Sequence, residues 1–318
     1  MSLEKHIATF SAERKFQNVK GQIRSMDFSS DGKNLAICCE TNKINLFDCE
    51  KGTHIDLPFI DCYKYGVGII KYANNSHPHY VIHSSTILDD HIRVLNLNSR
   101  QYKVYFKGHN NTVTSLSISP YDDTFLSGSK DNTAKLWDLR SSRFRGFVKL
   151  DGHPVVNYDP EGLIFAIGIN SESINLYDMR YYEKGPFKVF ELPSNMRGNW
   201  TSLKFSPNGK SIMINAEGSL IHLIDAFTGK PLHDPLNGRL NQGCRSLEAS
   251  FSPDSNLIFS GSDDGKSIIF WEQSTGKQVL ILKSSHMFPV KCVEFNPRLT
   301  MFASAGKELH FWVPANDK

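Results

Sequence analysis

The sequence predicts an all-β chain folded as a seven-bladed β-propeller, because one short pattern returns roughly every 40 to 48 residues. Each copy consists of an apolar strand, a turn resembling Ser-Pro-Asp-Gly, a second strand, and a third strand that ends in an aromatic or aliphatic residue and an acid. The clearest copy runs from Gly108 to Asp138. Two landmarks that recur in step with this period support the prediction.

The first landmark is an apolar strand that ends in a turn. It is found at Phe28-Ser29, Tyr72-Ala73, Ile118-Ser119-Pro120, Tyr158-Asp159-Pro160, Phe205-Ser206-Pro207, Phe251-Ser252-Pro253 and Phe295-Asn296-Pro297. The second landmark is the end of the third strand. It is found at Phe47-Asp48, Leu95-Asn96, Trp137-Asp138, Tyr177-Asp178, Ile224-Asp225, Trp271-Glu272 and Trp312-Val313. Both landmarks occur seven times and in step, so the chain contains seven repeats.

Sheet chemistry explains why these residues recur. Proline lacks an N–H and fixes φ, so after Ser, Asp or Asn it ends a strand and begins a tight turn. The segments between the turns are β-branched or aromatic with period-two alternation, as in Thr112 to Ile118. One four-stranded antiparallel blade cannot bury both of its faces alone. A closed ring of blades buries them against each other and leaves only short edges.

The whole chain is expected to form this single domain. The predicted repeats cover approximately residues 20–57, 65–106, 109–148, 153–191, 198–234, 244–282 and 288–313, the last completed by 5–12. The last repeat stops at Trp312-Val313-Pro314, which leaves too little chain for an outer strand. We therefore expect the segment from Lys5 to Phe10 to supply it, with Ile7 to Phe10 pairing with the last blade.

The third repeat contains the most complete set of polar residues, namely His109, Ser127, Asp131 and Trp137. Their spacing matches the hydrogen-bonded tetrad of WD-repeat blades, which stabilises a blade when every member is satisfied. A Ser/His/Asp catalytic triad is the alternative. The structural interpretation is favoured because no strained nucleophile elbow surrounds Ser127. No catalytic, metal-binding or cofactor-binding residue is predicted.

Composition is that of an ordinary soluble domain, with 40% hydrophobic and 22% charged residues and a net charge of +3. A net charge this small does not indicate nucleic-acid binding, and no direct nucleic-acid or membrane contact is expected. The six cysteines lack CxxC spacing and are interpreted as reduced thiols of an intracellular protein. The histidines between His77 and His91 are interpreted as loop and strand residues rather than a zinc site.

Cations near the two chain ends suggest where a partner could bind. Arg24 and Lys291 occupy equivalent positions in the first and last repeats, which ring closure makes neighbours. Lys15, Lys20 and Lys307 would lie in the same sector of the rim, diluted by nearby glutamates. Two interpretations remain open: an ordinary solvated face, or a seam that receives an acidic or phosphorylated segment.

Several stretches are more specific than generic repeat text. These are Lys64–Val67, Ser119–Phe125, Glu161–Ala166, Lys184–Phe187, Leu223–Phe227 and Leu247–Asp254. They resemble the small WD-repeat subunit of the COMPASS histone lysine methyltransferase complex, and the resemblance covers nearly the whole chain. In that family the same propeller type also serves the cleavage and polyadenylation machinery, in a module with a type-one protein phosphatase and a scaffold protein.

The resemblance implies a nuclear, non-enzymatic scaffold, monomeric within a hetero-complex and linked to RNA polymerase II. Its partners would be a methyltransferase subunit, or the phosphatase-module scaffold protein and its phosphatase. It does not distinguish histone methylation from mRNA 3′-end processing and transcription termination. It leaves open whether the phosphorylated polymerase tail is contacted directly.

A substrate receptor of a cullin-type ubiquitin ligase is the alternative of a different class. Trp137-Asp138-Leu139-Arg140 and Tyr177-Asp178-Met179-Arg180 end consecutive repeats, and such paired motifs resemble the adaptor-docking boxes of those receptors. The simpler interpretation is that Arg140 and Arg180 pair with acids on the propeller rim, and it is favoured because exposed arginine is common.

Overall fold

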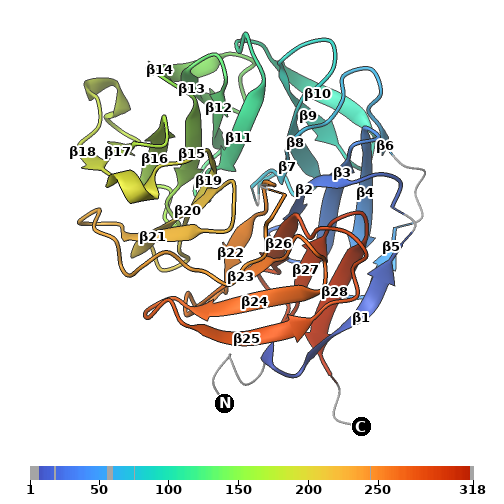
Figure 1. The fold of residues 1–318 in the computed structure, drawn as a ribbon. Coiled ribbons are helices and arrows are strands. Elements are labelled where there is room, and N and C mark those ends of the chain that lie inside the picture. The colour runs from blue at the N-terminus through green and yellow to red at the C-terminus, as the bar shows by residue number, and fades with distance from the viewer. Residues whose placement is uncertain (1–6, 18, 56–59, 75, 244, 316–318) are drawn as a thin grey trace.

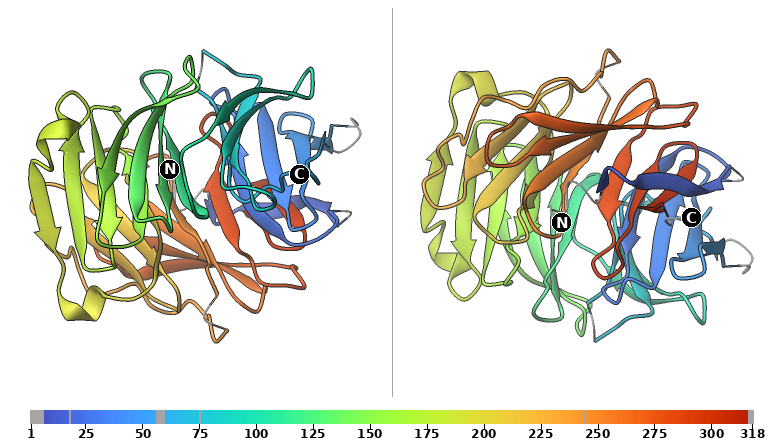
Figure 2. Two further views of the ribbon diagram at one scale, coloured as in Figure 1. Left: turned by 90° about the horizontal axis from the view of Figure 1, so that it is seen from above. Right: turned by 90° about the horizontal axis from the view of Figure 1, so that it is seen from below.

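A computed structural model describes residues 7–17, 19–55, 60–74, 76–243 and 245–315. Their strands form seven antiparallel sheets arranged as blades around a central axis (Figure 1). The views from above and below show the ring edge-on (Figure 2). The predicted seven-bladed propeller is confirmed. No helix among the described residues is long and apolar enough to cross a membrane.

The first four blades follow the chain. Blade one consists of β2 (Ile23–Phe28), β3 (Asn34–Cys39), β4 (Lys43–Asp48), β5 (Thr53–His54) and β6 (Ile60–Asp61). Blade two consists of β7 (Ile70–Tyr72), β8 (Tyr80–Ser84), β9 (Ile92–Asn96) and β10 (Gln101–Phe106). Blade three consists of β11 (Val113–Ile118), β12 (Thr124–Ser129), β13 (Thr133–Asp138) and β14 (Phe144–Lys149). Blade four consists of β15 (Pro154–Tyr158), β16 (Ile164–Ile169), β17 (Ser173–Asp178) and β18 (Lys188–Glu191).

The remaining blades complete the ring. Blade five consists of β19 (Trp200–Phe205), β20 (Ser211–Ala216) and β21 (Ile221–Asp225). Blade six consists of β22 (Ala249–Phe251), β23 (Leu257–Gly261), β24 (Ser267–Glu272) and β25 (Gln278–Lys283). Blade seven consists of β26 (Cys292–Phe295), β27 (Phe302–Ala305), β28 (Leu309–Pro314) and β1 (Phe10–Phe16). Two short 3₁₀ helices, η1 (Tyr182–Lys184) and η2 (Ser194–Met196), lie on either side of β18.

The N-terminal strand closes the ring, as predicted, but its position corrects the sequence-based boundary. β1 begins at Phe10 and pairs antiparallel with β28, from Phe10 opposite Pro314 to Phe16 opposite Leu309. Of the expected segment Ile7 to Phe10, only Phe10 therefore lies in the strand, and residues 5 and 6 lie outside the described residues. Ile7 is fully buried in the apolar cluster shared by blades six and seven. Because β1 continues to Phe16, the Phe16 ring packs against the Phe47 ring of blade one, with ring centroids 4.7 Å apart.

Most of the core lies between neighbouring blades. One cluster joins Ile23 and Phe47 of blade one to Phe311 of blade seven, and another joins Phe106 of blade two to Trp137 of blade three. Burial of each such side chain contributes about 1.5–3 kcal/mol. Blade five has no regular fourth strand, because its outer position is taken by a segment that contains Pro231 and pairs only at isolated bridges.

Candidate partner-binding surfaces

The third blade brings the four tetrad residues into one hydrogen-bonded chain. Trp137 Nε1 donates to Ser127 Oγ at 2.7 Å. Ser127 Oγ lies 2.7 Å from His109 Nε2, and His109 Nδ1 lies 2.8 Å from an Asp131 carboxylate oxygen. Burial lowers the pKa of His109, although Asp131 opposes the shift, so the ring is neutral at pH 7. Its Nδ1–H then donates to Asp131, and its Nε2 accepts from the Ser127 hydroxyl.

These distances equal those of a catalytic triad, but the serine is inaccessible. Ser127 is 0% exposed, and its oxygen already accepts a hydrogen bond from Trp137. Burial would raise the pKa of Asp131, yet hydrogen bonds led by that from Thr133 lower it to about 2. The carboxylate is thus fully engaged in holding the turn of its own blade. The geometry suits a structural network and offers no path for a substrate.

The seventh blade holds a second chain of this kind, which sequence reasoning missed. Trp312 Nε1 donates to Ser304 Oγ at 2.8 Å, and Ser304 Oγ lies 2.8 Å from His286 Nε2. The histidine precedes the serine by 18 residues, as in the third blade. The hairpin that follows is two residues shorter, since tryptophan comes 8 rather than 10 residues after serine. The shorter hairpin changes the spacing between serine and tryptophan, so the spacing of the third repeat did not reveal this network.

Glu308 and two stacked histidines surround this second network. The rings of His286 and His310 lie 3.7 Å apart and nearly parallel. One Glu308 carboxylate oxygen lies 3.3 Å from His310 Nε2 and 4.0 Å from His286 Nδ1. Burial lowers the pKa of His286 to about 3 and that of His310 to about 4. Parallel rings cannot direct both nitrogen lone pairs at one ion, so the cluster suits a shared carboxylate better than a metal.

A ring of polar residues occupies the next-to-last position of the innermost strands, and five of the seven line the central cavity. Its members are Asp27, Lys71, Ser117, Asn157, Lys204, Ser250 and Glu294. Three of them accept the backbone N–H that follows the equivalent position in the next blade. Asp27 accepts from Tyr72 at 2.7 Å, Ser117 from Tyr158 at 3.0 Å, and Asn157 from Phe205 at 2.9 Å. The sequence contained the signal, since a polar residue precedes the strand-ending residue in every repeat.

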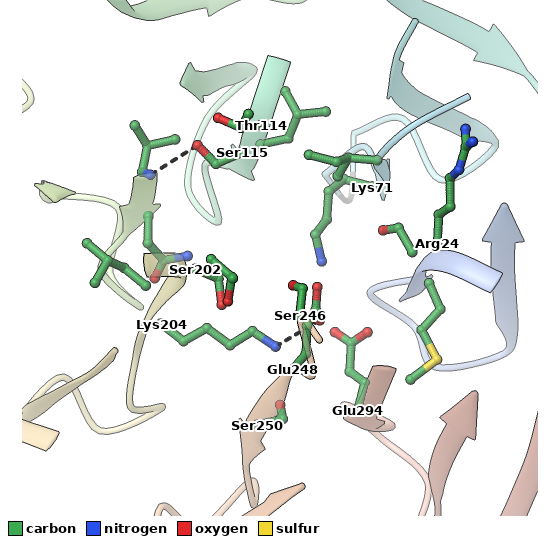
Figure 3. Close-up of a pocket in the computed structure, with 18 of the residues that line it drawn as sticks. Arg24, Lys71, Thr114, Ser115, Ser202, Lys204, Ser246, Glu248, Ser250 and Glu294 are labelled. Atoms are coloured by element: carbon green, nitrogen blue, oxygen red, sulfur yellow. Dashed lines mark hydrogen bonds and ion pairs between the residues drawn. The ribbon is translucent and has the colours of Figure 1, made fainter. Parts of the chain in front are cut away.

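The channel opens into a cavity of about 420 Å³ in which two lysines form ion pairs (Figure 3). Lys71 Nζ lies 2.5 Å from an Asp27 oxygen, and Lys204 Nζ lies 3.6 Å from Glu248. Burial raises the pKa of Glu294 to about 7, an effect that Lys71 opposes. Because acids and bases balance, the cavity has no single sign of charge to offer a ligand.

Among the five cations predicted to gather at the seam, Arg24 is directed toward another blade. Blades one and seven do meet there, with Cys292 Sγ 3.6 Å from the Arg24 carbonyl oxygen. However, the Arg24 guanidinium turns to blade two and donates to the Val67 carbonyl at 3.1 Å. Figure 3 shows it pointing away from Glu294. The guanidinium is thus held by a backbone acceptor of the neighbouring blade.

Three of the other four cations lie on the last blade, and the fourth precedes blade one. Lys15 stands opposite His310 across the closing strand pair, and Lys291 precedes the innermost strand of blade seven. Lys307 occupies the turn between β27 and β28, with its ammonium 4.0 Å above the Phe288 ring. Lys20 is exposed just before blade one. Three lysines therefore remain on blade seven without the arginine.

The two arginines of the ligase-like motifs are held within their own repeats. Arg140 donates through two nitrogens to both oxygens of Asp138, each at 3.1 Å. Arg180 makes the same fork with Asp178 at 3.1 and 2.8 Å. Both side chains are largely exposed. This geometry agrees with the rim interpretation, in which each arginine pairs with the acid that ends its repeat.

The histidines of the second repeat lie in separate environments. His83 is fully buried, and burial lowers its pKa to about 4. His91 pairs with Asp89 at 3.1 Å, while His77 lies 3.8 Å from Asp123 of blade three. They do not converge on one point. The five cysteines in the described part of the chain are buried and free.

Comparison with known proteins places this fold in a family. The WD domain, G-beta repeat, matches residues 100–138 and 229–271, and the anaphase-promoting complex subunit 4 WD40 domain matches residues 6–74. The chain is 47% identical to WD repeat-containing protein 82 of Drosophila melanogaster, over 98% of this chain and 96% of the relative. It is 30% identical to COMPASS component SWD2 of Saccharomyces cerevisiae, over 97% and 95%, respectively. It is 32% identical to Set1 complex component swd2 of Schizosaccharomyces pombe, over 79% and 71%. The chain therefore belongs to the family of WD-repeat proteins that includes WD repeat-containing protein 82 and Swd2.

Proposed function

We propose that this chain is a non-catalytic scaffold subunit of a nuclear Set1/COMPASS-type histone lysine methyltransferase complex. The observation that carries the proposal is likeness to a COMPASS component over 97% of the chain and to a Set1 complex component over 79% of it. A role in mRNA 3′-end processing with a type-one phosphatase, and a link to RNA polymerase II, form the second part of the proposal. It rests on the family resemblance in the residues alone.

The chemistry of the propeller supports a binding role. The Ser-His-Asp set of the third blade is buried and hydrogen-bonded to Trp137, and two lysines of the channel form ion pairs with carboxylates. A rigid ring with buried polar networks is well suited to presenting fixed loops to partners, because little conformational entropy is lost on binding.

For the partner surface, we propose the blade-seven side of the seam, where Lys15, Lys291 and Lys307 lie. An acidic or phosphorylated partner segment would gain attraction and faster encounter there, and its binding would weaken as salt rises. Arg24 would join this site only if it exchanged its bond to Val67 for the partner.

Affinity purification of the tagged chain from its own cells, with quantification of stoichiometric partners, tests the proposal. We expect a Set1-type methyltransferase and its associated subunits, or the phosphatase module, at one copy per propeller. Stoichiometric recovery of a cullin-ligase adaptor instead would support the receptor alternative and contradict the scaffold assignment. Arg140→Ala with Arg180→Ala should then abolish adaptor recovery, whereas the scaffold partners should be retained.

A further inference from the structure

A groove of about 820 Å³ runs along the outside of the ring between blades two and three. Its walls are β10 and the turn that connects β13 to β14 (Figure 1). The groove is lined by Lys103, Val104, Tyr105, Lys107, Arg140, Ser141, Ser142, Arg143 and Phe144. It lies on the outer circumference of the ring, away from the channel and from the lysines of blade seven.

The lining is strongly basic. It contains four cations, and none of the described residues that line it is acidic. Arg140 is partly neutralised by Asp138, but Lys103, Lys107 and Arg143 form no ion pair within the described part of the chain. The flanking sequence extends the pattern, because residues 99–108 and 139–150 contain seven basic residues and no acidic residue. The small net charge of the chain therefore conceals one concentrated positive surface.

Exposed aromatic rings lie beside these cations. Phe144 is 42% exposed and Phe147 is 55% exposed on the outer strand β14. Their rings meet edge to face with centroids 5.9 Å apart, and Trp137 supports Phe144 from the core at 5.9 Å. Lys135 Nζ lies 5.0 Å from the centre of the Phe144 ring. The same ammonium lies 5.8 Å from the centre of the Phe147 ring, so Lys135 covers part of both rings. The rest of each ring is exposed, next to ammonium and guanidinium groups that form no ion pair among the described residues.

We propose that this groove binds single-stranded nucleic acid. Cations that follow a backbone, together with aromatic rings on which bases stack, are the two components of sequence-tolerant single-strand binding. Lys103 lies in β10 and Lys107 directly follows the end of that strand, and four residues of extended chain span at most about 13 Å. A polymer with a phosphate at every unit can reach both, whereas one phosphorylated side chain can reach only one. A duplex offers no open base face to Phe147, so unpaired strands are preferred.

This inference departs from the expectation, drawn from net charge, of no direct nucleic-acid contact. It also goes beyond the scaffold role, since the groove and the blade-seven lysines occupy different parts of the ring. A propeller carrying both surfaces could hold a protein partner and a nucleic-acid strand at the same time.

Fluorescence anisotropy of labelled oligonucleotides, titrated with the purified full chain at two salt concentrations, tests the proposal. Probes of about 12 nucleotides match single-strand sites and should be tried as RNA, as DNA, and as a duplex. The groove variant is Lys107→Glu with Arg143→Glu. The matched control is Lys230→Glu with Lys277→Glu, which makes the same charge change on exposed residues of blades five and six. Phe147→Ala tests stacking, and thermal unfolding verifies that each variant is folded.

We expect single strands to bind with a salt slope of about −2 to −3, as for three or four phosphate contacts. The groove variant should lose at least about tenfold in affinity, and because it removes two phosphate contacts its slope should become shallower by about 1.4. Phe147→Ala should lose about fivefold or more, and the control should remain close to wild type. Absence of binding, equal loss in the control, or preference for duplex or for a phosphopeptide over single strands would overturn the proposal.

Discussion

Removal of Asp27 tests the electrostatic balance of the central channel. The Asp27 carboxylate pairs with the Lys71 ammonium at 2.5 Å and accepts the Tyr72 N–H at 2.7 Å. Asp27→Ala leaves a cation and a backbone donor without this partner. Breaking a buried pair costs about 3–5 kcal/mol. We expect the lower end, about 3 kcal/mol, because Lys71 keeps 28% exposure and Glu294 remains near it.

The expected loss can be expressed as a melting temperature. The entropy of unfolding is about 2.1 cal/mol/K per residue, which gives about 0.7 kcal/mol/K for 318 residues. A loss of about 3 kcal/mol therefore lowers Tm by about 4 °C. Differential scanning calorimetry at pH 7 measures this directly.

Two further variants separate the charge from the hydrogen bond. Asp27→Asn keeps an oxygen for the Tyr72 N–H and should be less destabilising than Asp27→Ala, by about 1 kcal/mol. Asp27→Ala with Lys71→Met removes both charges and should be more stable than Asp27→Ala alone. An Asp27→Ala protein that melts within 1 °C of wild type, or a double variant less stable than the single, would refute the reasoning.

Three further perturbations test the closure strand, the two tetrads and the buried titratable groups. Deletion through Phe16 leaves the edge of β28 unpaired, so Tm should fall by several degrees or the protein should aggregate; an unchanged melt would contradict the closure. Trp137→Ala and Trp312→Ala should each cost about 3–5 kcal/mol and Asp131→Ala about 1–3 kcal/mol in denaturant unfolding. If Asp131→Ala kept full stability but lost a specific activity, the structural role would be wrong. The pKa values of the stacked histidine pair lie below the ordinary value, so the unfolded chain takes up protons first as pH falls below about 6.5. Each such group weakens the fold by up to about 1.4 kcal/mol per pH unit, and Tm should drop between pH 7.5 and 5. The raised pKa of Glu294 acts in the opposite direction, because the folded chain binds this proton more readily than the unfolded chain. The Tm of Glu294→Gln should therefore drop more steeply with falling pH than that of the wild type. A Tm that stays flat in both proteins would contradict this.

Periodicity made the fold readable from the sequence, because each blade repeats one strand and turn chemistry. The extent of β1 was harder to predict. The predicted strand ended at Phe10, whereas the structure begins it there, since Ile7 is needed in the core and Phe16 reaches blade one. Apolar residues at both ends of the segment fit either register, and only the packing of two neighbouring blades decides between them.

The candidate sites were harder to predict than the fold, because the sequence does not show in which direction a side chain points. Equivalent positions placed Arg24 and Lys291 at neighbouring blades, but a carbonyl of the next blade attracts the Arg24 guanidinium. The basic groove arises because β10 and the start of β14 come together on adjacent blades. Its cations are separated in sequence by more than thirty residues, and the averaged net charge did not reveal them.

The scaffold assignment is tested most directly by the mass of the complex that the purified chain forms with a recombinant Set1-type methyltransferase subunit from the same source. Size-exclusion chromatography with light scattering gives that mass. We expect a single species with one propeller per methyltransferase subunit, retained when Asp131 is replaced by alanine in a folded protein. Separate elution of the two chains at micromolar concentrations, with the propeller folded, would contradict the assignment.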